Sequence, residues 1–219
     1  MNDSLVSVVM PMYNSESFIL DSIESVLSQT HRELELLIVN DCSTDSSLKI
    51  IGSISDERIK IFSNDRQLGI SRARNVGIRK SLGRYIAFCD SDDIWHPEKL
   101  SLQLHHMHKT GSYVSHTNAI IIGQNGKNIG KRVFPEMINF NKLIIRNYIL
   151  NSSGIYDAVI IGKIYQKDLR HEDYYMWLEI LSRSFQSIGV NECLVSYRVH
   201  DSNSSKNKFQ SFWWMLLVQ

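Results

Sequence analysis

Short apolar runs rich in β-branched residues alternate with helix-like segments four times within roughly the first 90 residues. The apolar runs cover residues 5–10, 34–39, 59–62 and 85–89, and each has the length of a buried strand. The segments between them carry apolar residues at helical spacing, as at Ile19, Ile23 and Val26. This order is typical of βαβ units and predicts an α/β protein with a Rossmann-like, mainly parallel central sheet flanked by helices. Ligands bind such sheets beyond the carboxyl ends of the strands.

Helices of the first half are predicted for residues 15–29, with Asn14 or Ser15 as N-cap, for residues 48–54 and for residues 70–81. Pro97 is well suited to the first turn of a further helix that runs to about Lys109. The second half is less regular. Its pattern predicts a strand at 113–122, a hairpin turn at 123–126, a helix at 139–148, an extended segment at 155–165, a helix at 173–183 and a strand at 190–199.

The chain has only three Pro and eleven Gly, and no linker-like stretch separates its halves. We therefore expect a single domain over residues 1–205, made of the halves 1–110 and 111–205. The net charge is +1, which gives no broad electrostatic case for binding nucleic acid. Any charged ligand must then be bound by local clusters.

The three cysteines, Cys42, Cys89 and Cys193, are odd in number and widely spaced, which is typical of reduced thiols in a cytoplasmic protein. The first residues have no basic region followed by a long apolar run, so they do not read as a signal peptide. No run approaches the roughly 20 apolar residues that span a bilayer. We expect a cytoplasmic protein that is soluble or peripheral on the inner face of the cell membrane.

The C-terminal segment, residues 206–219, has an apolar stripe at helical spacing that includes Phe209, Phe212 and Trp213. A helix is predicted here. It packs on the domain or on a partner, or it lies in a membrane interface with Lys206 and Lys208 near anionic head groups. The sequence leaves both alternatives open.

Polar clusters follow all four predicted strands, at Tyr13-Asn14, Asp41, Asn64-Asp65 and Asp90-Ser91-Asp92-Asp93. In the last cluster, an Asp-x-Asp on a turn after a strand offers oxygen ligands to a hard cation such as Mg²⁺ or Mn²⁺. Such a cation often bridges to phosphate oxygens, and a nucleoside diphosphate would be its natural partner. The alternative is an acidic turn whose negative charge favours the N-terminus of the next helix.

A series of motifs runs in order through nearly the whole chain: VSVVMPMYN, LELLIVNDCSTD, GISRARNVGI, GRYIAFCDSDDIWHPEKL and RHEDYYMWLEIL. In order and spacing this series resembles a family 2 glycosyltransferase of the GT-A fold. The part that reads YRVHDSNSS is similar to bacterial enzymes that build capsule, O-antigen or teichuronic-type polysaccharides. The resemblance implies that the first half binds a nucleotide sugar, most often a UDP-sugar, and that the second half binds the acceptor.

The resemblance also implies roles for individual residues. Tyr13 would stack on the base, Asp41 would accept the imide N–H of uracil, and Asp90 would bind the ribose hydroxyls. Arg74 would contact the base or the diphosphate. The residues implied at the nucleotide sugar are Pro11, Tyr13, Asn14, Asp41, Arg74, Asp90, Ser91 and Arg198.

Asp92 would ligate a Mn²⁺ or Mg²⁺ ion. On the last predicted strand, Arg198 and His200 share one face, from which either could reach the diphosphate or the metal, with His200 a candidate ligand. The alternative for these two residues is an ordinary polar pair at a strand end. Asp93 is left undecided between the site and a cap of the next helix.

Asp173 would be the catalytic base of an inverting transfer, in which one carboxylate removes the proton of the acceptor hydroxyl. Glu172 is its neighbour, and successive side chains on a helix point about 100° apart, so the two cannot face the same sugar equally. The acceptor implied is a glycan or an undecaprenyl-diphosphate-linked sugar. Donor sugar, acceptor, linkage and oligomeric state cannot be read from the sequence, nor can the roles of Asp157 and Asp168.

Two other functions are compatible with parts of the pattern. A non-catalytic nucleotide-sugar-binding scaffold of a polysaccharide assembly complex would keep the binding residues, but it has no need for Asp173. A nucleotidyltransferase also uses paired carboxylates, but normally brings a Gly-rich phosphate loop, and Pro11-Met12-Tyr13-Asn14 contains no glycine. His105, His106 and His108 lie on a helix, where a solvated face is the better interpretation.

Overall fold

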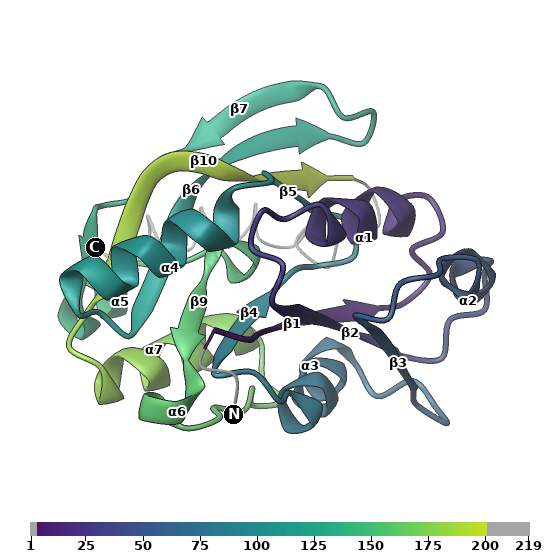
Figure 1. Ribbon diagram of the computed structural model, residues 1–219, viewed down its shortest axis with the longest axis horizontal. Coiled ribbons are helices and arrows are strands. Elements are labelled where there is room, and N and C mark those ends of the chain that lie inside the picture. Colours follow the sequence, from purple (N-terminus) through teal and green to yellow (C-terminus); the bar gives the residue numbers. More distant parts are fainter. Residues whose placement is uncertain (1–3, 201–219) are drawn as a thin grey trace.

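A computed structural model describes residues 4–200 of the chain. Four parallel strands form one side of its sheet in the order β3-β2-β1-β4. They are β1 (Val6–Met12), β2 (Leu34–Asn40), β3 (Ile59–Ser63) and β4 (Tyr85–Phe88). Every residue of β1, β2 and β4 is buried, as expected where helices cover both faces of a parallel sheet. The four strands confirm the predicted βαβ pattern (Figure 1).

The helices divide between two hydrophobic cores, one on each face of the sheet. One core joins α1 (Ile19–Leu27), α2 (Ser47–Gly52) and α4 (Lys99–Thr110) to alternate β1 residues such as Val8. The other joins α3 (Ile70–Lys80) and α7 (Glu172–Arg183) to the intervening residues such as Val9. A Cβ on Gly77 of α3 would lie 2.5 Å from a methyl group of Val9, so glycine lets α3 pack directly on β1. Figure 1 shows α1 and α3 on opposite faces.

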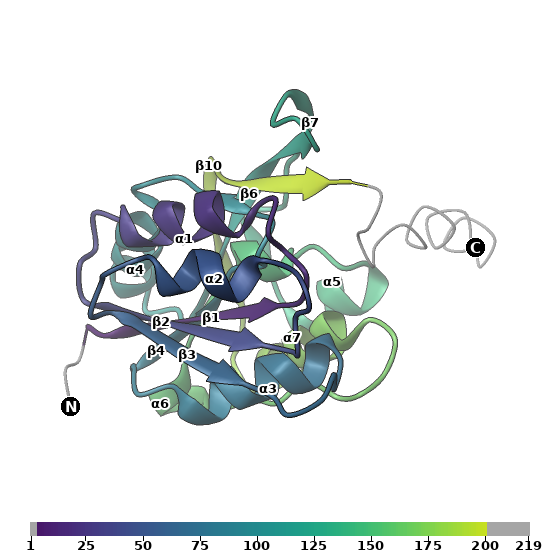
Figure 2. The same cartoon turned by 90° about the vertical axis from the view of Figure 1, so that its right-hand side faces the viewer.

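The sheet continues through the second half of the chain in mixed directions. A short antiparallel strand, β9 (Ile155–Asp157), connects β4 to the parallel pair β6 (Val114–Gly123) and β10 (Ser187–Val199). The outer elements are β5 (Ile94–Trp95), β7 (Asn128–Arg132), β8 (Met137–Ile138), α5 (Phe140–Ile145), the 3₁₀ turn η1 (Asn151–Ser153) and α6 (Ala158–Ile161). Figure 2 shows β6, β7 and β10 gathered beyond the first four strands.

Several predicted boundaries are wrong in this structure. The extended segment at 155–165 ends after three residues, because the Asp157 side chain accepts hydrogen bonds from Val159 and Ile160 and starts α6. The first helix begins at Ile19 with Phe18 as N-cap, so neither Asn14 nor Ser15 caps it. Pro97 lies in the turn before α4, which begins at Lys99. The helix predicted at 139–148 covers only Phe140–Ile145, although Asn139 does cap it.

The hairpin turn is confirmed, since Gly126 donates to the Gly123 carbonyl and β6 pairs with β7. The predicted C-terminal helix at 206–219, and with it the predicted membrane contact, lies outside the described residues. Between residues 4 and 200, none of the helices combines the length and the hydropathy that crossing a bilayer requires.

Candidate active site

A cavity of about 700 Å³ lies at the carboxyl ends of β1, β2 and β4 and extends to the end of β10. It brings together most residues that the sequence predicts at a nucleotide sugar or metal: Pro11, Tyr13, Asn14, Asp41, Asp90, Ser91, Asp92 and His200. Four predicted residues do not line it: Arg74, Glu172, Asp173 and Arg198. Its location at the carboxyl ends of parallel strands is where ligands bind in α/β sheets.

The Asp41 carboxylate is almost fully buried and holds the chain at the start of α3. One oxygen accepts hydrogen bonds from the Asn64 amide and the Leu68 N–H at 2.7 and 2.8 Å, and the other accepts from the Gly69 N–H at 2.8 Å. Gly69 has a φ of 92°, a conformation that side-chain-bearing residues rarely adopt. A carboxylate has about four lone-pair positions, so Asp41 retains capacity for one further donor.

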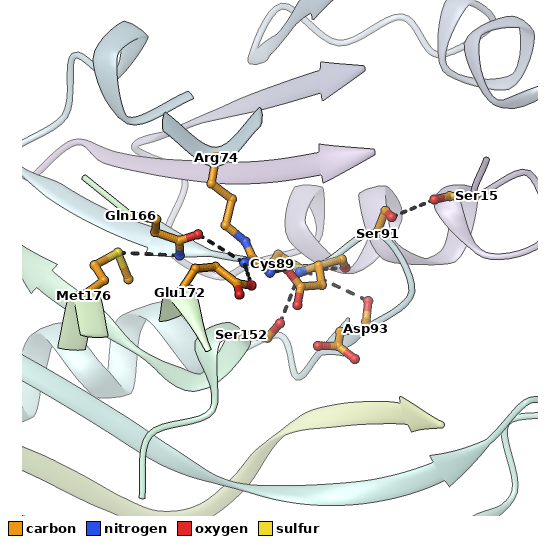
Figure 3. Close-up of polar contacts among 10 residues, drawn as sticks. Ser15, Arg74, Cys89, Ser91, Asp93, Ser152, Gln166, Glu172 and Met176 are labelled. Carbon is orange, nitrogen blue, oxygen red and sulfur yellow. Dashed lines mark hydrogen bonds and ion pairs between the residues drawn. The ribbon is translucent and has the colours of Figure 1, made fainter. Parts of the chain in front are cut away.

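The loop after β1 is fixed by hydroxyl and amide contacts. Asn14 adopts a left-handed φ of 48°, and its side-chain oxygen accepts a hydrogen bond from the Thr44 N–H at 2.8 Å. The hydroxyls of Ser15 and Ser91 are hydrogen-bonded at 2.7 Å, which ties this loop to the acidic turn after β4 (Figure 3). Tyr13 remains 44% exposed at the cavity, as a residue that stacks on a base requires.

The acidic turn divides its three carboxylates. Asp90 and Asp92 line the cavity, and the Asp92 carboxylate lies 2.9 Å from Nε2 of His200. Burial raises the pKa of Asp92 and the charge of Asp90 raises it further, while the contact with His200 lowers it. Asp93 points inward, is fully buried, and accepts the Arg198 N–H at 3.0 Å. Of the two roles left open for Asp93, the helix cap does not apply, since the N-cap residue of α4 is Glu98.

The Arg198 side chain lies behind the acidic turn. Its Nε donates to the Asp92 carbonyl at 2.9 Å and its Nη1 to the Gln124 carbonyl at 3.2 Å. The guanidinium stacks 4.7 Å from the centre of the Phe18 ring, which in turn lies 4.8 Å from the His200 ring. Arg198 therefore contacts the backbone of the predicted metal ligand, and its contact with a diphosphate stays a prediction.

Glu172 and Asp173, the predicted catalytic base and its neighbour, begin α7. They come directly after His171, which adopts a left-handed φ of 63°. Glu172 accepts a hydrogen bond from Nη1 of Arg74 at 3.1 Å. Asp173 is 8% exposed, and among the described residues its carboxylate has no hydrogen bond or ion pair. The structure thus engages Glu172 within the protein and leaves the Asp173 carboxylate uncommitted.

Arg74 is the centre of a buried polar cluster between the two halves of the chain. Its side chain is 3% exposed and its Nη2 lies 2.6 Å from Asp90. Burial would lower its pKa, but the charges of Asp90 and Glu172 raise it above the ordinary value. In this structure the guanidinium contacts protein carboxylates behind the cavity. The predicted contact with base or diphosphate is not tested.

A divalent cation fits the donor set at the end of β10. Asp92 and His200 supply a carboxylate oxygen and an imidazole nitrogen that meet at one wall of the cavity, with Asp90 nearby. Carboxylate and imidazole together suit Mn²⁺, whereas Mg²⁺ prefers oxygen ligands. Between residues 4 and 200, no cluster of three or more His, Cys, Asp or Glu side chains has ligand geometry, so phosphate oxygens or water must complete the coordination.

Sequence reasoning missed several residues that line the cavity, chiefly Phe18, Gln67 and Tyr197. Phe18 follows the PMYN loop closely and could have been included on that ground, whereas Gln67 has no recognisable signal. The structure also shows the partners of Asp157 and Asp168, whose roles the sequence left open. Asp157 pairs with Arg84 at 2.8 Å besides capping α6, and Asp168 forms an exposed ion pair with Arg72 at 2.7 Å. Neither lines the cavity.

Comparison with known proteins places this geometry among sugar-transferring enzymes. The profile of the family described as Glycosyl transferase family 2 matches residues 7–168. The chain is 38% identical over 211 residues to UDP-Glc:alpha-D-GlcNAc-diphosphoundecaprenol beta-1,3-glucosyltransferase WfgD of Escherichia coli, covering 96% of this chain and 83% of the relative. It is 35% identical to the putative teichuronic acid biosynthesis glycosyltransferase TuaG of Bacillus subtilis, covering 94% and 84%.

Among solved structures, S. aureus TarS in complex with UDP-GlcNAc superposes with a TM-score of 0.77 at 25% identity. The match covers 90% of this chain but only 59% of that protein. The match therefore extends over both halves of this chain and leaves part of TarS outside it.

Proposed function

This chain belongs to glycosyl transferase family 2 and has the GT-A fold, and we propose that it transfers a sugar from a UDP-sugar, with inversion, to a hydroxyl of a lipid-linked glycan in bacterial surface polysaccharide synthesis. The observation that carries this proposal is the cavity itself. Its lining includes Asp41, Asp90 and the Asp92–His200 pair, which supports binding of the base, the ribose and the diphosphate of a nucleotide sugar, respectively.

The donor would bind through contacts that the protein has already fixed. The remaining lone pair of Asp41 would accept the uracil N–H, and Tyr13 would stack on the base. One oxygen of Asp90 accepts a hydrogen bond from Arg74, and the residue also lines the cavity. Its other oxygen would accept hydrogen bonds from the ribose hydroxyls. Since loop and turn are joined through Ser15 and Ser91, little ordering is left to occur on binding.

Asp92 and His200 would hold a Mn²⁺ or Mg²⁺ ion. When bound, such an ion offsets the negative charge of the diphosphate leaving group. Burial and the charge of Asp90 raise the pKa of Asp92, which means that its ionised form is disfavoured. A bound cation would favour the ionised form. Arg198 would keep Asp92 in place through the bond to its carbonyl oxygen.

Asp173 would act as the general base. Its carboxylate takes the proton from the acceptor hydroxyl while that oxygen forms a bond to the anomeric carbon. The bond between the anomeric carbon and the diphosphate oxygen breaks, and the electron pair leaves with UDP. Glu172 supports this assignment indirectly, because its ion pair with the buried Arg74 leaves Asp173 as the uncommitted carboxylate of α7.

The acceptor and the setting are proposed from the relatives. The name of the Escherichia coli enzyme specifies a UDP-glucose donor and a diphosphoundecaprenol-linked acceptor, and that of the Bacillus subtilis protein specifies teichuronic acid biosynthesis. A lipid-linked acceptor would place the chain at the cytoplasmic face of a membrane, as a peripheral protein.

Thermal unfolding with UDP and Mn²⁺ or Mg²⁺, followed by a transfer assay, tests the proposal. UDP together with the ion should raise Tm, and UDP with EDTA should not. The best-binding UDP-sugar should then be transferred to a synthetic diphospholipid-linked sugar, with inverted anomeric configuration of the product. Tight UDP binding without transfer or hydrolysis of any UDP-sugar would instead favour a non-catalytic binding protein.

A further inference from the structure

The segment between α6 and α7, residues 162–171, lies along α3 and contacts it at three levels. Near the C-terminus of α3, the Lys163 ammonium donates to the carbonyls of Arg79 and Ser81 at 3.1 and 2.8 Å. Near its N-terminus, the exposed pair between Arg72 and Asp168 joins the two. The segment ends where α7 and the proposed base begin, so its contacts with α3 come directly before the first turn of α7.

The contact at the middle of α3 is the most specific of the three. The Asn75 side chain forms two hydrogen bonds with the backbone of Gln166, accepting from its N–H at 2.7 Å and donating to its carbonyl at 2.8 Å. A reciprocal pair of this kind fixes both position and direction of the backbone, since shifting either partner breaks both bonds. Asn75 thus determines where Gln166 lies.

The Gln166 side chain is buried and extends the contact into the site. Its Oε1 accepts a hydrogen bond from Nη1 of Arg74 at 3.2 Å, and its Nε2 points at Sδ of Met176 on α7 at 3.7 Å. The same Nη1 donates to Glu172, while Nη2 of Arg74 binds Asp90. Figure 3 shows Arg74 reaching between Gln166 and Glu172.

This arrangement holds the Arg74 guanidinium at both of its terminal nitrogens. Nε of Arg74 is buried and has no hydrogen-bond partner among residues 4–200, so the acceptors that set the plane of the group are Gln166, Glu172 and Asp90. Two of these belong to the donor and base machinery proposed above. Gln166 is the third, and it has no other connection to the cavity.

We propose that Asn75 and Gln166 are positioning residues for the transfer reaction, which fix the Arg74–Glu172 pair and hold the first turn of α7, with Asp173, at the correct distance from the donor. The proposal rests on the proposed function. Proton transfer requires the base within hydrogen-bond reach of the acceptor hydroxyl, and a displacement of about 1 Å can cost on the order of 100-fold in rate. Donor binding depends on the other side of Arg74, where Asp90 keeps its own ion pair.

The test uses the full chain, Mn²⁺ and the UDP-sugar that the wild-type protein turns over. Gln166→Met keeps the length of the side chain but removes the acceptor for Arg74, and Asn75→Ala removes both bonds to the Gln166 backbone. Each variant should lower kcat about 10-fold or more, with KM for the donor and Kd for UDP within about 2-fold of wild type. The kcat of the double variant should be only slightly lower than that of either single variant, because Asn75 acts by positioning Gln166.

Lys163→Met is the matched control, since it removes contacts between the same segment and α3 at the far end. It should lower Tm and leave kcat within about 2-fold. A loss of kcat in Lys163→Met equal to that in Gln166→Met would overturn the positioning role, as would a raised KM with unchanged kcat.

Asp173→Asn, measured in parallel, separates this proposal from the proposed function. If Asp173→Asn is inactive while Gln166→Met and Asn75→Ala keep wild-type kcat, the positioning role alone is wrong. If Asp173→Asn transfers sugar at the wild-type rate, the proposed base and the positioning role both fail.

Discussion

Among the predicted site residues and their neighbours, adjacent carboxylates occur at the turn with Asp92 and Asp93 after β4 and at the first turn of α7 with Glu172 and Asp173. Each pair is split in the same way. Asp93 and Glu172 are bound inside the protein, by the Arg198 N–H and by the Arg74 guanidinium, respectively. Asp92 lines the cavity and Asp173 has no bonded partner among the described residues. One member of each pair fixes the backbone that presents the other.

The partners of Asp93 and Glu172 nevertheless differ in charge. Burial raises the pKa of Asp93 well above its ordinary value and the charges of Asp92 and Asp90 raise it further, while hydrogen bonds with Ser152 and the Arg198 N–H lower it. Glu172 instead forms an ion pair with the buried guanidinium of Arg74. Neighbouring carboxylates in a sequence can therefore be held in different ways, one by neutral hydrogen-bond donors and the other by a cation.

The largest effect is expected from removing Asp173, the acid in the first turn of α7 that has no hydrogen bond or ion pair among the described residues. Asp173→Asn should lower kcat for sugar transfer by about 10³-fold, since a positioned general base contributes 10²- to 10⁴-fold. Kd for UDP, measured by calorimetry with Mn²⁺, should stay within about 2-fold of wild type.

Glu172→Gln is the comparison for that variant. It keeps the shape of the side chain and an oxygen that can still accept the hydrogen bond from Arg74, so the pair is weakened but not lost and kcat should fall less than about 10-fold. Equal losses in the two variants would mean that the paired Glu172 and the unpaired Asp173 do not have different roles in α7.

Breaking the ion pairs that Arg74 forms with Glu172 and Asp90 should have the next largest effect, this time on stability. Arg74→Met leaves Asp90 and Glu172 without their buried cation, which should lower the free energy of unfolding in urea by about 3 kcal/mol. Arg72→Met, two residues earlier on α3, removes a pair whose side chains are more than half exposed and should cost less than about 1 kcal/mol. Similar losses in both would show that Arg74 is not the buried centre described above.

The sequence predicted the first half of the fold well, because buried parallel strands and amphipathic helices carry their own periodicity. It failed at residues 155–165, where an apolar run that reads as one strand is interrupted by the cap at Asp157. It also missed β5, a two-residue strand whose pairing with β10 depends on a contact about 100 residues away. Tertiary contacts of this kind leave no local pattern.

For the site, the strand-end rule and the family motifs located the residues of the cavity. They assigned Asp92 to the metal and preferred Asp173 to Glu172 as the base, but they did not show which groups bind Asp93 and Glu172. Gln166 had no signal at all, since its importance arises only when Asn75 on a distant helix binds its backbone. Residue type at a motif was predictable, but the partner of each side chain was not.

A smaller effect is expected from Asp92, the outward acid of the turn, and it concerns ligand binding. UDP with Mn²⁺ at about 100 times Kd should stabilise the wild-type protein by about 2.7 kcal/mol. Asp92→Ala should abolish the part of this stabilisation that EDTA removes, because it deletes one of the two proposed ligands. The Tm of Asp92→Ala with UDP should be the same with Mn²⁺ and with EDTA, and a remaining difference would assign the metal to other groups.

The smallest effect is expected from Asp93→Asn, which replaces the inward acid of the turn by its neutral isostere. Because the pKa of Asp93 is raised, the folded protein keeps the proton at pH values where the unfolded chain, with an ordinary pKa of 3.8, has lost it. Stability from this group therefore falls as pH rises above 3.8 towards the raised pKa of the folded state. Asparagine has no proton to lose, so the variant should be within about 1 kcal/mol of wild type at pH 5 and relatively more stable at pH 8. Urea unfolding at both pH values in EDTA measures this difference. A variant that loses stability from pH 5 to pH 8 as steeply as wild type would mean that the proton of Asp93 makes no contribution to the pH dependence of stability.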